Sequence, residues 1–297
     1  ILRSDFDSEI LSELDETVRD HVIECLGVEN LAAVIAGMES DDALEVVLEL
    51  DEDEQRQVLD AIPPGDRTLI EEGLTYPEDS AGRLMQREVM AAPQFWSVGD
   101  TIDHVRSQGE ELPELFFDIY VVDPLNRPVG GVAVSQLLRA PRSAALTDLM
   151  EPINEIAVDQ DQEEVAYVFE KYHLISAPVI DSAGRLVGQI TVDDIVNIIQ
   201  EENREDILRL AGVSDEDRGS SIPEIVRGRV PWLAVNLGTA VLGARVISWF
   251  GATLEQIIAL AVLMPIVSAI GGNAGTQALT VTVRALATRE LNSSNAV

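Results

Sequence analysis

The sequence predicts a multidomain chain. An α+β part, made of a short helical bundle and a tandem pair of strand–helix units, precedes an α-helical transmembrane part of which two helices are present. Three observations support this fold class. Residues 1–75 carry short amphipathic helical patterns, residues 117–130 have a partner 58 positions later, and no charged residue occurs from Gln256 to Val283. An uncharged apolar stretch of more than about 18 residues is typical of a membrane-spanning helix.

The acidic composition restricts the expected partners. The formal net charge is −33, and the residues from Arg227 onward are mildly basic, so the acidity lies in the first 226 residues. Nucleic acid is not expected as a partner, because phosphate binding requires positive charge; divalent cations are the expected small ligands. Adaptation to a salty environment is an alternative explanation for part of the charge, since Lys171 is the only lysine. The single Cys25 excludes a disulfide framework.

We predict an acidic helical domain over residues 1–78. Apolar residues recur there at helical spacing, and Ser40-Asp41-Asp42 is typical of a helix start, because acidic side chains stabilise the positive end of a helix. The simplest interpretation of the acidic faces that include Asp41 and Asp42 is a solvated surface. In the functional interpretation, these carboxylates share Mg²⁺ or Ca²⁺ with a neighbouring domain.

A repeat occupies the middle of the chain. Residues 117–130 and 175–188 share their Asp, Arg and Gly positions in register, and each copy continues into a strand-like segment and a helix. Upstream of the two copies, Arg83-Leu84-Met85 corresponds to Asp148-Leu149-Met150. Internal similarity of this length indicates two copies of one supersecondary unit.

This repeat resembles a tandem pair of CBS (cystathionine-β-synthase-type) domains, which we place at residues 79–146 and 147–203. The family signature ends in a Thr/Ser-x-x-Asp sequence that opens a helix, and the second copy has it as Thr191-Val192-Asp193-Asp194. In that family, the Thr and the final Asp can hold the ribose of an adenine nucleotide. The resemblance therefore implies this role for Thr191 and Asp194, with ATP as a second candidate ligand of the chain.

A structural role for the same motif is the alternative. Asp193 has the position of a residue that caps the following helix, which requires no ligand. In the first copy, Ser135 and Gln136 replace the acidic pair. The sequence leaves the two interpretations open.

The helix predicted after Asp194 carries acidic side chains four residues apart on one face. These pairs are Glu201 with Glu205, and Glu202 with Asp206. Like charges at this spacing destabilise a helix by about 0.2–0.5 kcal/mol per pair, and a bound divalent cation would reverse that effect. Alternatively, Arg204 and Arg209 neutralise part of the charge. We expect residues 204–228 to connect this helix to the membrane part.

Residues 229–297 are predicted to begin a transmembrane domain. Trp232 and Trp249 bracket the first predicted span, as aromatic side chains at membrane interfaces do. The basic Arg227-Gly228-Arg229 precedes this span, which by the positive-inside tendency places residues 1–226 in the cytoplasm.

The second predicted span carries a polar stripe on an otherwise apolar helix. Its members recur at helical spacing: Asn273, Thr276, Gln277, Thr280 and Arg284. Polar groups at bilayer depth are costly unless they face protein or water, so such a stripe lines a water-filled path or a polar helix contact. Gly271 and Gly275 also have the small-x-x-x-small spacing of close helix packing, and a packing motif without a transport role is the alternative.

Three stretches carry a more specific resemblance. They are Gly271-Gly272-Asn273-Ala274-Gly275-Thr276-Gln277 in the second span, Tyr76-Pro77-Glu78-Asp79-Ser80-Ala81-Gly82-Arg83-Leu84-Met85 before the repeat, and Glu205-Asp206-Ile207 in the joining helix. With these motifs, and with its parts in the same order, the chain resembles the MgtE-type magnesium transporter family over nearly its whole length.

The resemblance implies a homodimer in the lipid bilayer of the cell membrane, with a connecting plug helix and five membrane helices per subunit. Mg²⁺ would be both the transported ion and the regulator, because cytoplasmic Mg²⁺ bridges carboxylates in this family and holds the pore closed. The implied metal-binding carboxylates are Asp161, Glu163, Asp194, Glu202, Glu205 and Asp206, with Asp41 and Asp42 from the helical front. Asn197 and His173 stand where further carboxylates are expected, which puts at least one sensor site in doubt.

In the implied pore, Asn273 contacts a hydrated Mg²⁺. Gly271, Gly272, Thr276 and Gln277 complete the predicted pore lining. A polar, uncharged wall suits Mg²⁺, because this ion gives up its water reluctantly. The family's pore carboxylate lies in the last membrane helix, which this chain does not contain, so we expect the chain to be a piece of a longer protein.

Two functions from different classes remain after the resemblance is considered. The first is a magnesium (divalent cation) channel or transporter gated by cytoplasmic Mg²⁺. The alternative is an adenine-nucleotide-regulated membrane transporter or membrane-anchored regulator. An enzyme is not expected, because the sequence shows no pairing of nucleophile and base, and His21, His104 and His173 have no ligand spacing.

Overall fold

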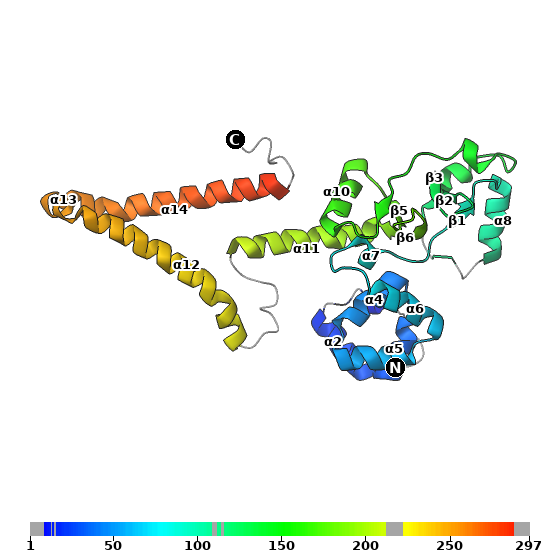
Figure 1. Ribbon diagram of the computed structural model, residues 1–297, viewed down its shortest axis with the longest axis horizontal. Coiled ribbons are helices and arrows are strands. Elements are labelled where there is room, and N and C mark those ends of the chain that lie inside the picture. The colour runs from blue at the N-terminus through cyan, green and yellow to red at the C-terminus, as the bar shows by residue number, and fades with distance from the viewer. Residues whose placement is uncertain are drawn as a thin grey trace. The chain divides into compact units, whose positions relative to one another are not determined.

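The computed structural model describes residues 9–12, 14, 16–108, 112–113, 116–211 and 222–287. The chain divides into two compact units, Ile1–Asp206 and Ile207–Val297. The first unit contains the helices and sheets of the predicted α+β part, and the second contains the long apolar helices (Figure 1).

The front of the first unit is a bundle of short helices. They are α1 (Glu9–Ser12), α2 (Glu16–Leu26), α3 (Val28–Ile35), α4 (Ser40–Glu49), α5 (Glu52–Ala61) and α6 (Pro64–Gly73). Each is too short to be stable alone in water, so the bundle depends on a shared apolar core. Local signals set the boundaries: Asp51 accepts hydrogen bonds from the amides of Asp53 and Glu54, and Pro64 occupies the first turn of α6.

Two three-stranded sheets follow the bundle. The first contains β1 (Ala91–Pro93), β2 (Asp118–Val122) and β3 (Pro128–Ala133); the second contains β4 (Ile156–Ala157), β5 (Ser176–Ile180) and β6 (Leu186–Thr191). In both sheets the central strand pairs in parallel with the strand before it and antiparallel with the strand after it. The predicted tandem repeat of strand–helix units is therefore confirmed.

Helices accompany each sheet. They are α7 (Ala81–Leu84), α8 (Val98–Gln108), α9 (Val134–Leu137), the 3₁₀ turn η2 (Leu146–Asp148), α10 (Gln162–Tyr172) and α11 (Val192–Ala211). The hairpin turns of the two sheets match in detail. Asp123 accepts hydrogen bonds from the amides of residues two and four positions later, and Asp181 does the same. The left-handed turn position is Asn126 in one copy and Gly184 in the other.

The two copies exchange their leading segments. The segment with α7 precedes the first sheet in sequence, yet Ala81 and Met85 belong to the core of the second sheet, and the amide of Ala81 donates to the carbonyl of Gln160 at 2.8 Å. Conversely, Leu146 of η2 is fully buried in the core of the first sheet, and its amide donates to the carbonyl of Trp96. Each core is therefore completed by the leading segment of the other copy.

The second unit consists of α12 (Ile222–Trp249), α13 (Gly251–Gln256) and α14 (Ile258–Ala287). In the part of the chain that the structure describes, Arg229–Trp249 is the segment long and apolar enough to cross a membrane by length and composition. Helix α12 begins before the predicted span and has Pro231 inside it. Helix α14 continues without a break through Pro265 and Gly271, and its crossing of a membrane remains a prediction.

The exchanged packing predicts a strong effect of a small substitution. A Cβ atom at Gly188 of β6 would lie 2.6 Å from the carbonyl oxygen of Gln86 and 3.0 Å from the Sδ of Met85, so Gly188→Ala must displace backbone. We expect Gly188→Ala to lower the free energy of unfolding by about 1–3 kcal/mol, measured by chemical denaturation of the chain in detergent. Gly65→Ala is the matched control, because a Cβ atom there meets nothing within 4 Å. Equal stability of the two variants would contradict the exchange.

Candidate functional site

The start of α4 and the start of α11 bring carboxylates of the helical bundle and of the second sheet together. Asp41 and Asp42 lie in the first turn of α4, and Asp193 and Asp194 lie in the first turn of α11. Burial raises the pKa of Asp41 well above its usual range, and the negative charges of Asp194 and Asp42 raise it further. Two segments about 150 residues apart in sequence thus form one site of crowded negative charge.

The end of β6 holds Asp194 in place. Thr191 is the last residue of β6, and its Oγ1 donates a hydrogen bond to Oδ2 of Asp194 at 2.7 Å. Burial raises the pKa of Asp194 to about 6, and the charges of Asp193 and Asp42 add to that rise, whereas the hydrogen bond from Thr191 opposes it. The ionised form of this carboxyl is therefore disfavoured by its surroundings unless a cation is near.

The donor chemistry of this acidic cluster (Asp41, Asp42 and Asp194) fits a hard divalent cation. Magnesium prefers oxygen ligands, keeps several of its waters and is usually held by one or two carboxylates. Among the residues described by the structure, no group of three or more His, Cys, Asp or Glu side chains has a metal-binding arrangement. A fully hydrated or partly hydrated ion between the two helix starts requires no such closed cage.

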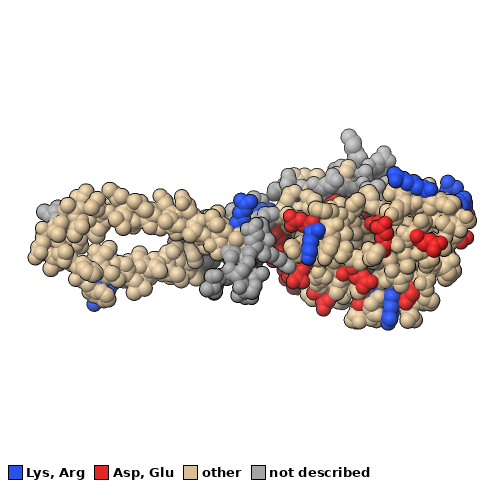
Figure 2. All heavy atoms as spheres, turned by 90° about the horizontal axis from the view of Figure 1, so that it is seen from above, with Lys and Arg blue, Asp and Glu red and all other residues tan. Residues whose placement is uncertain are grey.

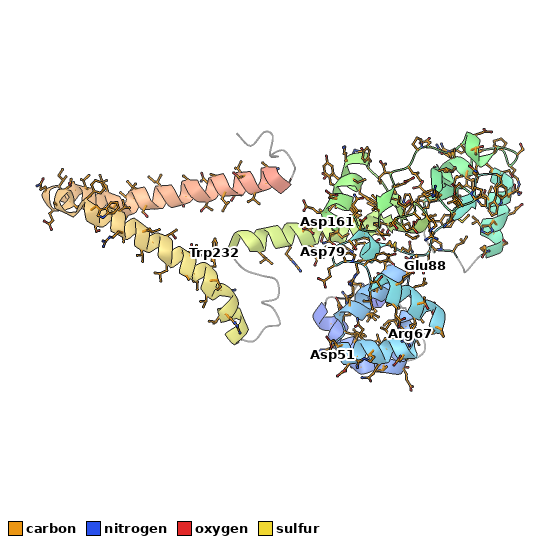
Figure 3. The ribbon with its side chains drawn as sticks, viewed as in Figure 1. Asp51, Arg67, Asp79, Glu88, Asp161 and Trp232 are labelled. Atoms are coloured by element: carbon orange, nitrogen blue, oxygen red, sulfur yellow. The ribbon has the colours of Figure 1, made fainter. Side chains whose placement is uncertain are left out.

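The remaining predicted sensor carboxylates lie around the start of α10. Oδ1 of Asp161 accepts from the amide of Glu163 at 3.0 Å, which caps that helix, and both side chains are exposed. Oε1 of Glu202 accepts from Nε2 of Gln162 at 2.9 Å, so α11 meets α10 at this point. Asp161 and Asp79 lie near each other (Figure 3), and the amide of Gln162 donates to the carbonyl of Asp79. The side chains of Glu205 and Asp206 lie outside the described residues.

The predicted pore residues lie on α14. Cβ atoms built at Gly271, Gly272 and Gly275 meet nothing within 4 Å, so this face is open within the described part of the chain. Oγ1 of Thr276 donates to the carbonyl of Gly272 at 3.1 Å, and Asn273 is exposed. The second unit therefore leaves the predicted stripe accessible, and its role as a pore lining stays a prediction.

The predicted nucleotide pair is intact in one repeat. Thr191 and Asp194 contact each other at the end of β6, whereas the equivalent end of β3 has Ala133 and Gln136. Nε2 of Gln136 donates to Oε1 of Glu151 at 2.8 Å. The hydroxyl and carboxylate that the motif provides for a ribose thus occur at the second copy and are absent at these two positions of the first.

The residues that join the bundle to the sheets next to the acidic cluster were not among the site residues predicted from the sequence. Ser40, Glu72, Arg87 and Glu88 make the hydrogen bonds and ion pair at this junction. A charged pair that follows the Tyr76–Met85 motif was the available signal, but sequence spacing does not show what such a pair contacts.

The raised pKa values predict a falling stability at rising pH. A carboxyl that is protonated more readily in the folded state than in the unfolded state stabilises the fold at low pH and loses that contribution as pH rises through its folded pKa. With divalent cations chelated, we expect the thermal unfolding temperature to fall between about pH 4, near the usual pKa of an Asp carboxyl, and about pH 6, the raised pKa of Asp194. Asp194→Asn should flatten this change. Asp181→Asn is the control, because hydrogen bonds from Arg185 lower the pKa of Asp181; a wild-type profile that rises over this interval would contradict the site.

Comparison with known proteins gives this arrangement a family. The family model described as the MgtE intracellular N domain matches residues 1–79, and the CBS domain model matches residues 146–201. Magnesium transporter MgtE of Thermus thermophilus is 33% identical over 255 residues, which cover 84% of this chain and 56% of that protein. Magnesium transporter MgtE of Bacillus subtilis is 31% identical over 294 residues, 98% of this chain and 64% of that protein. The chain thus spans less than two thirds of the length of these relatives.

Solved structures agree with the sequence comparison. The crystal structure of the cytosolic domain of the Mg²⁺ channel MgtE in complex with ATP aligns with a TM-score of 0.59 and 30% identity, over 64% of this chain and 78% of that one. The soluble part of a magnesium transporter aligns with a TM-score of 0.56 and 25% identity, over 66% and 86%. With its helical N domain, its CBS pair and its long apolar helices in the same order, the chain belongs to the MgtE family.

Proposed function

We propose that this chain forms the ion-sensing part and the first membrane helices of a magnesium transporter whose pore is closed by cytoplasmic Mg²⁺. The observation that carries this proposal is the acidic cluster, in which α4 of the bundle and α11 after the second sheet meet through like charges. Without a cation, the charges oppose the docking of the bundle; a divalent ion between them makes docking favourable. The fraction of molecules with a docked bundle then depends on the cytoplasmic Mg²⁺ concentration.

We propose a second group of ion-binding carboxylates along α11. Glu202 lies on α11 beside the start of α10, and Glu205 and Asp206 follow it within one helical turn. Ions held by these carboxylates, together with Asp161 and Glu163, would fix the plug helix relative to the CBS pair. A lower Mg²⁺ concentration releases the plug helix, because the acidic faces then repel one another.

The charge distribution supports a cytoplasmic position for residues 1–226. In Figure 2, Asp and Glu side chains gather on the first unit, whereas the face drawn of α12–α14 is almost free of charged side chains. The apolar side chains of α12 are exposed along its length, as they are in helices that contact lipid or other membrane helices. We place α12 and α14 in the cell membrane as spans of a multi-pass protein.

In the membrane, we assign α14 to the pore wall. Asn273, Thr276 and Gln277 offer uncharged polar groups that suit a hydrated Mg²⁺. The open glycine face of the same helix suits close contact with another membrane helix, such as one from a second subunit in a homodimer. The names of the relatives, both magnesium transporters, support transport as the function.

A second ligand, ATP, is favoured by one observation. The hydroxyl of Thr191 and the carboxylate of Asp194 form a bonded pair at the end of β6, and the similar cytosolic domain named above was solved with ATP. Because Asp194 belongs both to this pair and to the acidic cluster, a nucleotide ribose would share a carboxylate with the cation site. The nucleotide is therefore proposed as a modulator of the Mg²⁺ response.

Mutation of the acidic cluster tests the sensor. We expect Asp41→Asn together with Asp42→Asn to make protection of the bundle–sheet junction from proteolysis less dependent on Mg²⁺, because the variant loses both the repulsion and two ligands of the cation. Protection in chelator should rise, and the midpoint of any remaining Mg²⁺ effect should shift upward about tenfold or more, which corresponds to about 1.4 kcal/mol. Asp51→Asn is the matched control, because Asn also caps a helix and Asp51 lies at the exposed start of α5. If millimolar Mg²⁺ changes nothing in the wild-type chain, the sensor proposal is wrong.

Calorimetric titration with ATP tests the second ligand. Thr191→Ala removes the hydroxyl of the ribose pair and keeps all three carboxylates of the acidic cluster, so we expect loss of ATP binding with the Mg²⁺ response retained at a pH well above the pKa of Asp194. Gln136→Ala in the first copy is the control and should bind ATP as the wild type does. Equal ATP affinity of the Thr191→Ala variant and the wild type would rule out this site.

A further inference from the structure

Arg87 connects three parts of the first unit. It lies between α7 and β1, and its side chain is 13% exposed. Its Nη2 lies 2.8 Å from Oε2 of Glu72 on α6, and its Nη1 donates to the carbonyl of Val187 on β6 at 3.3 Å. The guanidinium carbon is also 5.9 Å from the ring centroid of Tyr76. One side chain therefore contacts the last helix of the bundle and the strand that leads to Asp194.

The backbone next to Arg87 holds the start of α4. The amide of Arg87 donates to Oγ of Ser40 at 2.7 Å, and the same Oγ donates to Oε2 of Glu88 at 2.8 Å. The amide of Ser40 also donates to Oε2 of Glu88, at 3.3 Å. Glu88 thus places a carboxylate at the positive end of α4, which stabilises that helix end. Figure 3 shows Glu88 at the junction of the bundle with the sheets.

These contacts lie next to the acidic cluster on both of its sides. Ser40 directly precedes Asp41, and β6 continues from Val187 to Thr191, whose hydroxyl contacts Asp194. Each of these contacts joins two protein groups and needs no ion between them. The junction therefore favours the assembled cluster while the repulsion between its carboxylates opposes it.

We propose that Arg87 is a positioning residue: with Glu72, Val187 and the Ser40–Glu88 pair it forms a metal-independent latch that holds Asp41 and Asp42 against Asp194 before Mg²⁺ arrives. This inference rests on the proposed sensor function for its physiological meaning, but the latch itself exists without the ion. The latch increases the population of the docked state that binds the cation, and the apparent affinity for Mg²⁺ rises with that population.

The side chain at position 87 has partners in two directions, which explains why this position holds arginine. A guanidinium is planar and has donors in several directions, so it serves a carboxylate and a carbonyl at once, whereas a lysine ammonium is a point charge on a flexible stem. Arg87→Lys keeps the charge and should restore part of the function that Arg87→Ala loses. A residue that contributed only bulk to the fold would show no such partial rescue.

Hydrogen exchange of the full chain in detergent, with and without Mg²⁺, tests the latch. In chelator, we expect the backbone amides at positions 40 and 87 to exchange about three- to tenfold faster in Arg87→Ala than in wild type, after correction for the intrinsic rate of each residue type. The Mg²⁺ concentration that restores protection should rise by a similar factor. Arg142→Ala is the matched control. Arg142 also contacts one carboxylate, Asp103 at 2.6 Å, and one carbonyl, Gly99 at 3.3 Å, but within the first CBS unit.

The outcomes separate the two proposals. Equal exchange of Arg87→Ala and wild type in chelator overturns the latch, whatever Mg²⁺ does. Faster exchange in that variant together with no Mg²⁺ effect on the wild type supports the latch and overturns the sensor function. If Arg87→Ala unfolds at a lower temperature than Arg142→Ala, the Glu72→Gln variant is measured instead of Arg87→Ala. The exposed Glu72 side chain can change without loss of the core. Exchange of Glu72→Gln at the wild-type rate in chelator then overturns the latch.

Discussion

Electrostatic repulsion between the starts of α4 and α11 is the constraint on which the arrangement of the first unit depends. The pKa values of Asp41 and Asp194 are raised because burial and neighbouring carboxylates disfavour their ionised forms. Later on the same helix, Glu45 and Glu49 pair with the guanidinium of Arg19 from α2. The first turn of α4 instead faces Asp194, and the proposed cation would relieve this repulsion.

The position of this repulsion determines which helix a change in charge can affect. The acidic cluster lies where the bundle meets the strand that runs into α11, so a change in charge acts on the same helix that leads toward the membrane part. In the proposed function, a neutralised cluster favours docking of the bundle, and the docked bundle restricts α11. The first unit would then convert the Mg²⁺ concentration into a restraint on this one helix.

The sequence predicted the parts of the molecule better than the contacts between them. The repeat was predictable because Asp123 and Asp181 form the same turn in both copies, and local hydrogen bonds of this kind leave a residue signature. The acidic residues were also named in advance, Asp41 and Asp42 from their place at a helix start and Asp194 from the resemblance to the family. Their meeting was not predictable from spacing, because the docking of α4 depends on Arg87 and Glu88, whose partners lie about 50 to 100 residues away.

The exchange of leading segments has a consequence for the order of folding during synthesis. Helix α7 leaves the ribosome long before β6, yet Ala81 and Met85 belong to the core that β6 completes. The first sheet likewise waits for Leu146, made after all three of its strands. At synthesis rates of about 5–20 residues per second, the apolar face of α7 stays uncovered for seconds. The two CBS units thus reach their native cores as a pair, and the helical bundle is the part of the first unit free to fold ahead of them.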